Sequence, residues 1–171
     1  MEYIAHIGSL GCYVFEKVNE VGNWHSVLAN ISTELQKIRG CSVVLTIIDP
    51  YFLNVKDCDA EEYANALIMM FKENGFRKIQ IFSKKPGLLS NNKFKNALLQ
   101  QKQIKFEFST IPNDIHDRFW ITNELTGVVV GTSLNGLGKK LSLVYQISGD
   151  DMTILHNELL DRNINCQPNL E

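Results

Sequence analysis

The chain of 171 residues is long enough for one domain and too short for two comfortable cores, so we expect a single domain over residues 1–171 with one core. The composition, with 44% hydrophobic and 21% charged residues, is that of a soluble globular protein and excludes a disordered or fibrous chain. The formal net charge of −2 is small but is unevenly distributed along the sequence.

No apolar run reaches the roughly 20 residues that a membrane span needs. The N-terminus lacks the basic and apolar regions of a secretory signal, and the last residues carry no lipidation pattern, so a cytoplasmic protein is expected. The cysteines are far apart and form no C-x-x-C pair, and the histidines are scattered. This spacing predicts reduced thiols, no metal and no cofactor.

The first two predicted elements are a helix over residues 24–38 and a strand over residues 43–48. Apolar residues recur at helical spacing in the first segment, and Gly40 follows where a helix often ends in a left-handed residue. The second segment is β-branched and apolar throughout, which is typical of a central parallel strand buried on both faces. It ends at Asp49-Pro50-Tyr51-Phe52, which we interpret mainly as a strand-ending turn.

A second helix is predicted from Asp59, which forms a capping box with Glu62, to Gly75. Residues 4–15 are expected to add edge strands, and the strands expected at 118–122 and 127–131 are close enough to pair as a hairpin. The sequence therefore predicts an α/β fold with a mixed, mostly parallel central sheet flanked by helices. The other expected elements are a strand at 78–83, a helix capped by Ser90, strands at 104–109 and 141–147, and a closing helix near Asp150.

Residues 77–105 contain eight basic residues and no acidic one, whereas acids outnumber bases on both sides of this block. The block is either a surface that faces a polyanion or a solvated basic helix that acids from elsewhere in the fold neutralise. Both interpretations stay open at this point. The basic residues are Arg77, Lys78, Lys84, Lys85, Lys93, Lys95, Lys102 and Lys105.

A polar motif surrounds the strand expected at residues 118–122. His116 and Arg118 are two residues apart, so within a strand they would project from the same face and place a nucleophile and a cation in one pocket. Ser133 and Asn135 follow the next strand, in a glycine-rich loop whose N–H groups can approach an anion. A phosphate-binding P-loop is excluded because Leu137 stands where that motif requires lysine.

The segments Ile115-His116-Asp117-Arg118 and Gly131-Thr132-Ser133-Leu134-Asn135 resemble the phospholipase D-like superfamily, whose motif is H-x-K-x-x-x-x-D followed by G-S-x-N. The Asp49-Pro50-Tyr51 turn is similar to one found after a core strand in many bacterial members. The resemblance covers roughly residues 40–150 and implies a phospholipase D-like sandwich.

By this resemblance His116 would attack phosphorus to give a phosphohistidine, Arg118 would supply the cation, and Ser133 and Asn135 would bind the phosphate oxygens. Two positions depart from the motif. Arg118 replaces lysine, which keeps the charge but brings a larger, planar group. Asn123 replaces aspartate, which removes a carboxylate. These departures favour binding over turnover.

Short members of the superfamily with one motif pair across a two-fold axis. The resemblance therefore implies a homodimer with the site near that axis.

Two functions are compatible with these features. The first is a metal-independent phosphodiesterase, such as a nuclease, in which Lys84, Lys85, Lys93 and Lys95 hold the backbone of DNA or RNA. The second is an inactive phospholipase D-like subunit, a dimeric pseudoenzyme that binds nucleic acid, a protein partner or a phospholipid headgroup, for example in a bacterial defence assembly. Nucleic acid is favoured over a membrane because no amphipathic helix of the membrane-inserting kind accompanies the basic residues.

Overall fold

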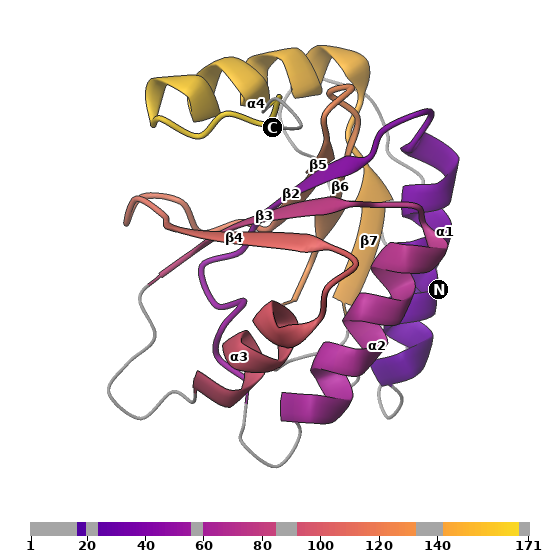
Figure 1. Cartoon of the computed structure of the whole chain (residues 1–171). Helices are drawn as coiled ribbons and strands as arrows, with labels where there is room; N and C mark the ends of the chain where they lie inside the picture. The colour runs from indigo at the N-terminus through magenta and orange to yellow at the C-terminus, as the bar shows by residue number, and fades with distance from the viewer. Residues whose placement is uncertain (1–16, 20–23, 56–59, 85–91, 133–141, 168–171) are drawn as a thin grey trace.

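The computed structural model describes residues 17–19, 24–55, 60–84, 92–132 and 142–167. Within them the chain forms four helices and seven strands in the α/β class (Figure 1). The order is β1 (Lys17–Asn19), α1 (Trp24–Ile38), β2 (Val44–Ile48), α2 (Ala60–Glu73), β3 (Lys78–Ser83), α3 (Asn92–Gln100), β4 (Lys105–Thr110), β5 (Phe119–Thr122), β6 (Gly127–Val130), β7 (Ser142–Gln146) and α4 (Gly149–Asp161).

The strands form one mixed sheet in the order β1-β7-β6-β5-β2-β3-β4. Strands β2, β3 and β4 are parallel and are connected by α2 and α3. The pairs β2–β5, β5–β6, β6–β7 and β1–β7 are antiparallel. The expected mixed sheet and the expected hairpin of β5 and β6 are confirmed, but the sheet is not mostly parallel, because only the β2–β4 half has helices that bring the chain back in the same direction.

Helices cover both faces of the sheet (Figure 1): α1, α2 and α3 lie on one face and α4 lies on the other. Because strand side chains alternate, each face has its own cluster of buried side chains, rather than the single core expected from chain length. Ile47, Ile81 and Trp120 belong to the larger cluster under α1–α3. Ile48 and Phe82 belong to the smaller cluster under α4.

The boundaries of the first elements follow from simple sequence signals. Helix α1 has the bounds expected from its apolar periodicity, and every residue of β2 is buried. Gly40 and Gly75 follow the ends of α1 and α2 with φ of +55° and +73°. Glycine tolerates this left-handed conformation, which ends a helix.

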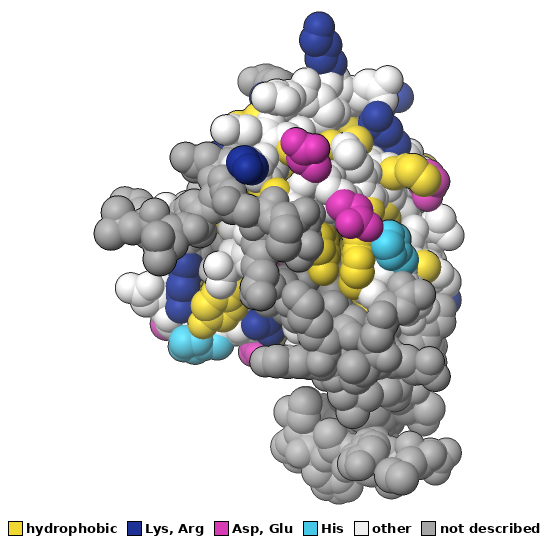
Figure 2. Space-filling view, turned by 90° about the horizontal axis from the view of Figure 1, so that it is seen from below, with side chains coloured by type: hydrophobic (Ala, Val, Ile, Leu, Met, Phe, Trp, Pro, Cys, Tyr) yellow, Lys and Arg dark blue, Asp and Glu magenta, His cyan; other side chains and the backbone are white. Residues whose placement is uncertain are grey.

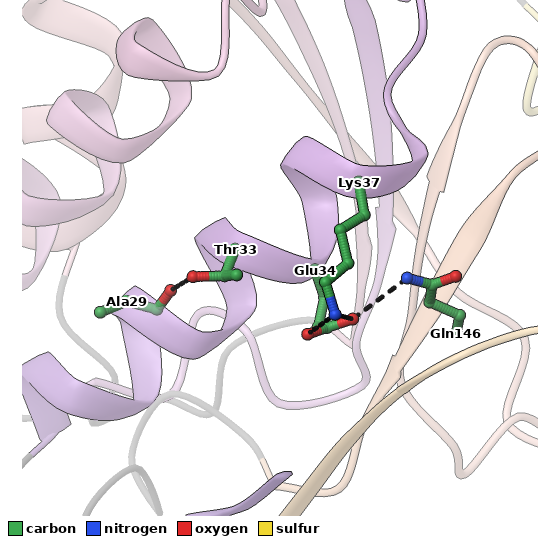
Figure 3. Close-up of polar contacts among 5 residues, drawn as sticks. All are labelled: Ala29, Thr33, Glu34, Lys37 and Gln146. Carbon is green, nitrogen blue, oxygen red and sulfur yellow. Dashed lines mark hydrogen bonds and ion pairs between the residues drawn. The ribbon is translucent and has the colours of Figure 1, made fainter. Parts of the chain in front are cut away.

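One charged side chain of α1 lies in the protein interior. Glu34 is fully buried, and its carboxylate accepts hydrogen bonds from Lys37 Nζ at 3.0 and 3.2 Å and from Gln146 Nε2 at 3.1 Å (Figure 3). Gln146 belongs to β7, so the carboxylate connects α1 to the antiparallel half of the sheet. A buried carboxylate is tolerated only with such partners.

Among the described helices, none has the length and hydropathy required to cross a membrane.

Candidate functional site

The carboxyl ends of β2, β3 and β4 lie at one edge of the sheet because these strands are parallel. Strand β5 begins at the same edge, since it runs antiparallel to β2 and Ile48 pairs with Phe119. In open α/β sheets, ligands commonly bind beyond the carboxyl ends of the strands. The side chains gathered there, which we call the edge site, are Asp49, Tyr51, Ser83, Lys84 and Arg118.

Asp49 directly follows β2 and is only 2% exposed. Its Oδ1 accepts the N–H of Tyr51 at 2.8 Å, which forms the turn expected at Asp49-Pro50. Burial raises the pKa of Asp49 to about 6, and the Tyr51 N–H and the charge of Arg118 oppose this rise. A carboxylate at this position therefore titrates near neutral pH and also shapes the turn.

Arg118 lies between this carboxylate and an aromatic ring. Its Nε is 3.5 Å from Asp49 Oδ1, and its guanidinium carbon is 5.7 Å from the centroid of the Tyr51 ring. Lys84 Nζ approaches the same ring, at 5.5 Å. Tyr51 is 41% exposed, so an accessible aromatic ring lies beside two cations at the edge site.

The basic block of residues 77–105 divides into two groups. Lys78 and Lys105 both pair with Glu107, at 3.2 and 3.1 Å, so one acid from outside the block partly neutralises these two lysines. Partial burial acts to raise the pKa of Glu107, but these two pairs and a hydrogen bond from Gln80 together hold that pKa below its usual value. Lys84 contributes to the edge site, and Lys95 Nζ lies 4.7 Å from the Phe108 ring centroid.

On the face that Figure 2 draws, the basic side chains of the described residues lie apart from one another, with acidic, hydrophobic and other side chains among them. Lys84, Lys93 and Lys95 remain predicted nucleic-acid contacts. Lys85 lies outside the described residues.

His116 has different surroundings from Arg118. It is exposed and lines a hollow of about 170 Å³ beside α4, whose walls include Phe119, Leu155 and Leu159. Arg162, also in the wall, binds Asp114 Oδ2 at 2.9 Å and Glu158 Oε2 at 2.7 Å. The hydrogen bond from Arg162 to Asp114, with a smaller contribution from the charge of His116, holds the pKa of Asp114 below its usual value.

The two motif residues do not lie within one strand, as the sequence suggested. β5 begins at Phe119, and a backbone hydrogen bond from Val130 extends the strand pattern to Arg118, but the chain bends at Asp117, so the alternation does not continue to His116. The described contacts of the Arg118 side chain go to Asp49 and Tyr51, and none of the edge-site residues lines the hollow of His116.

Asn123 lies at the sheet edge opposite the edge site, where it bonds β2. Its Oδ1 accepts the N–H of Val44 at 3.2 Å, and its own N–H bonds the Val44 carbonyl at 3.2 Å. Val44 is the first residue of β2, whereas the edge site follows the last one. Asn123 therefore takes part in strand pairing at a distance from Arg118.

Ser133 and Asn135, the expected phosphate-binding pair, lie outside the described residues. The described chain ends before them with Gly131 and Thr132, which follow β6. Val130, the last residue of β6, donates its N–H to the Arg118 carbonyl at 3.0 Å, so β6 ends at the edge where β5 begins.

Sequence reasoning did not find two polar features of the structure, one in the edge site and one under α1. It did not connect Asp49 to Arg118, because only the β2–β5 pairing brings them together. It also passed over Glu34, although that residue continues the helical spacing of Val27 and Ile31 into the core. A carboxylate at a core position of a helix is a signal of a buried polar contact.

Within the described part of the chain, no group of three or more His, Cys, Asp or Glu side chains is arranged to hold a metal ion. Cys41 and Cys166 are free thiols, and burial raises the pKa of Cys166 to about 12. A thiol with such a pKa is a poor nucleophile at neutral pH.

No family model matches the chain, and no curated protein matches it.

Proposed function

We propose that this chain is a phospholipase D-like protein that binds the phosphodiester backbone of nucleic acid at the edge site. The observation that carries the proposal is the pair of cations, Arg118 and Lys84, beside the accessible ring of Tyr51. Arginine and lysine bind phosphate oxygens through charge-assisted hydrogen bonds. Cations combined with an aromatic ring are the usual means of holding single-stranded nucleic acid.

Lysines of α3 supply further positive charge. Lys93 and Lys95 lie in the first turn of α3, the helix that follows β3, and Lys95 rests on Phe108 of β4. In a β–α–β unit the helix begins at the carboxyl edge of the strands, which is the edge of Arg118. A backbone held by Arg118 and Lys84 would therefore continue toward these lysines, and its affinity would depend on salt.

The described contacts support binding more strongly than hydrolysis. A histidine nucleophile has to reach the phosphorus atom that the neighbouring cation holds. His116 instead lines the hollow beside α4, where Asp114 and Glu158 share the single positive charge of Arg162 and leave a negative surplus that would repel a phosphate group. We therefore propose binding as the main activity, and phosphohistidine chemistry at His116 as weak or absent.

The homodimer with its site near a two-fold axis stays a prediction from the family resemblance. Light scattering of the purified chain measures its molecular mass directly.

The proposal is tested with labelled single- and double-stranded DNA and RNA in EDTA, at two salt concentrations, with the wild-type protein and His116→Ala. We expect salt-sensitive binding by both proteins and no cleavage by either. Metal-independent cleavage that disappears in His116→Ala would establish a nuclease instead. Failure of both proteins to bind any of the four probes would contradict the proposal.

A further inference from the structure

Two buried polar atoms of the edge site have no hydrogen-bond partner among the described residues. They are Ser83 Oγ and Arg118 Nε. Ser83 is 4% exposed, and Arg118 Nε lies 3.5 Å from Asp49 Oδ1, beyond the usual range of an N–H···O bond. A buried donor without an acceptor is unfavourable, and an oxygen atom of a bound ligand would remove that cost.

These atoms belong to residues in one row on one face of the sheet. Ile47, Ile81 and Trp120 lie in the cluster under α1–α3, and the residues two positions from them toward the edge are Asp49, Ser83 and Arg118. The backbone hydrogen bonds of the sheet extend to this row: the Asp49 N–H donates to the Phe82 carbonyl and the Val130 N–H donates to the Arg118 carbonyl, both at 3.0 Å. The carboxylate thus lies between the two unpaired donors.

Asp49 retains acceptor capacity toward a ligand. The Tyr51 N–H and Arg118 Nε both approach its Oδ1, and the described residues make no hydrogen bond to its Oδ2. A carboxylate repels an anion that carries no proton, such as a phosphodiester or sulfate. It accepts a short O–H···O⁻ hydrogen bond from an anion that carries one.

A phosphomonoester is the nucleic-acid group that carries such a proton near neutral pH, since its second pKa is about 6. Burial raises the pKa of Asp49 to a similar value, about 6, so one proton can be shared between the two oxyanions. Ser83 Oγ–H and Arg118 Nε–H would donate to the other phosphate oxygens, while Lys84 adds positive charge nearby.

We propose that the edge site recognises a terminal phosphate, so that the chain binds a phosphorylated end of single-stranded nucleic acid in preference to an internal phosphodiester. Asp49 is the residue that selects the monoester, and Ser83 is a phosphate-binding residue outside the His116 motif. This inference rests on the proposed function, because the backbone beyond the terminal phosphate would be held by Lys84 and the lysines of α3.

The test compares two labelled single-stranded DNA molecules of one sequence, with a 5′-phosphate or a 5′-hydroxyl, by fluorescence anisotropy in EDTA. A 3′-phosphorylated form covers the other terminus. We expect about tenfold tighter binding of one phosphorylated end, the effect of one charge-assisted hydrogen bond. Inorganic phosphate should compete for the site at lower concentration than sulfate.

Two variants assign the preference to residues. In Asp49→Asn the amide oxygen can still accept the Tyr51 N–H. The side chain then has no carboxylate that could share a proton with a phosphomonoester or repel a phosphodiester, so the preference for a phosphorylated end should disappear. Ser83→Ala should reduce binding of the phosphorylated end about threefold to tenfold. Ser42→Ala is the matched control, because Ser42 Oγ is also buried and unpaired but precedes β2, at the other edge.

The outcomes separate this inference from the function on which it rests. If the wild type binds all ends with equal affinity and Lys84→Ala weakens this binding, the inference is overturned and backbone binding still holds. No binding of any single strand would overturn both. A preference that Asp49→Asn keeps, or that Ser83→Ala and Ser42→Ala reduce equally, would also contradict the roles assigned to Asp49 and Ser83.

Discussion

Arg118 and Asp49 meet across the β5–β2 pair, with Nε 3.5 Å from Oδ1, in a pair whose carboxylate is almost fully buried. The pairing of these strands, with Ile48 opposite Phe119, brings one residue of the Asp49-Pro50 turn beside one residue of the His116 motif. The aspartate offsets part of the positive charge of Arg118, but the 3.5 Å separation is too long for a hydrogen bond that would pair the two groups fully. An incoming anion therefore meets a cation that is positioned but not fully paired.

The stability of the protein should depend on pH through Asp49. Its pKa rises from 3.8 to about 6 on folding, so the folded state holds more protons than the unfolded state between these values. The free energy of unfolding should therefore fall as pH rises from about 4 to about 6, by roughly 1–3 kcal/mol. Urea unfolding at several pH values measures this change.

Asp49→Asn supplies the comparison that isolates this effect. Glu107 and Asp114 have lowered pKa values, and they act in the opposite direction because their stabilisation is lost as pH falls. The difference between wild type and Asp49→Asn cancels these contributions. A difference that stays constant from pH 4 to 6 would show that Asp49 does not titrate in this range.

The buried carboxylate of α1 should be important for stability. Glu34→Ala removes the acceptor for Lys37 and Gln146 and should lower the free energy of unfolding by about 2–4 kcal/mol (Figure 3). Glu34→Gln, which keeps the shape and one acceptor, should cost less. Glu61→Ala on the exposed face of α2 is the control and should change stability by under about 0.5 kcal/mol. Equal urea midpoints for Glu34→Ala and Glu61→Ala would refute this role.

An aspartate introduced at position 123, which would complete the motif that the sequence resembles, should not create an enzyme. In Asn123→Asp a carboxylate oxygen can still accept the Val44 N–H, so we expect a stability change of under about 1 kcal/mol. Position 123 lies beside the first residue of β2, whereas Arg118 lies beside its last residue, so a carboxylate at 123 cannot assist His116 directly. Cleavage assays in EDTA check this, and His116-dependent cleavage gained by the variant would contradict the placement of Asn123.

The sequence was sufficient for the elements whose patterns are strong. The helical spacing of α1 and the alternation of β3 gave the bounds that the structure has, because long periodic segments define their own buried face. The start of β5 was placed at Arg118 rather than Phe119, since a bend at Asp117 leaves no mark in the hydrophobic pattern.

Fewer features of the edge site than of the fold can be predicted from the sequence. Arg118 was identified as a candidate cation from its motif, but its partner Asp49 is distant in the sequence and had been assigned mainly to a turn. Ser83 looked like the last residue of a strand, and only its burial without a partner distinguishes it. Such features arise when strands pair, so a one-dimensional pattern cannot contain them.

The most direct test of backbone binding at the edge site compares Lys84→Ala with Lys102→Ala. Both remove one lysine from the same basic block, but Lys102 is exposed and precedes β4, at the opposite edge from Lys84. Binding of labelled single-stranded DNA is followed by anisotropy at several salt concentrations. Lys84→Ala should weaken binding about fivefold to tenfold and reduce the salt slope by about one, while Lys102→Ala should stay within about twofold of wild type. Equal losses in the two variants, or no loss in Lys84→Ala, would show that the edge site does not hold the backbone.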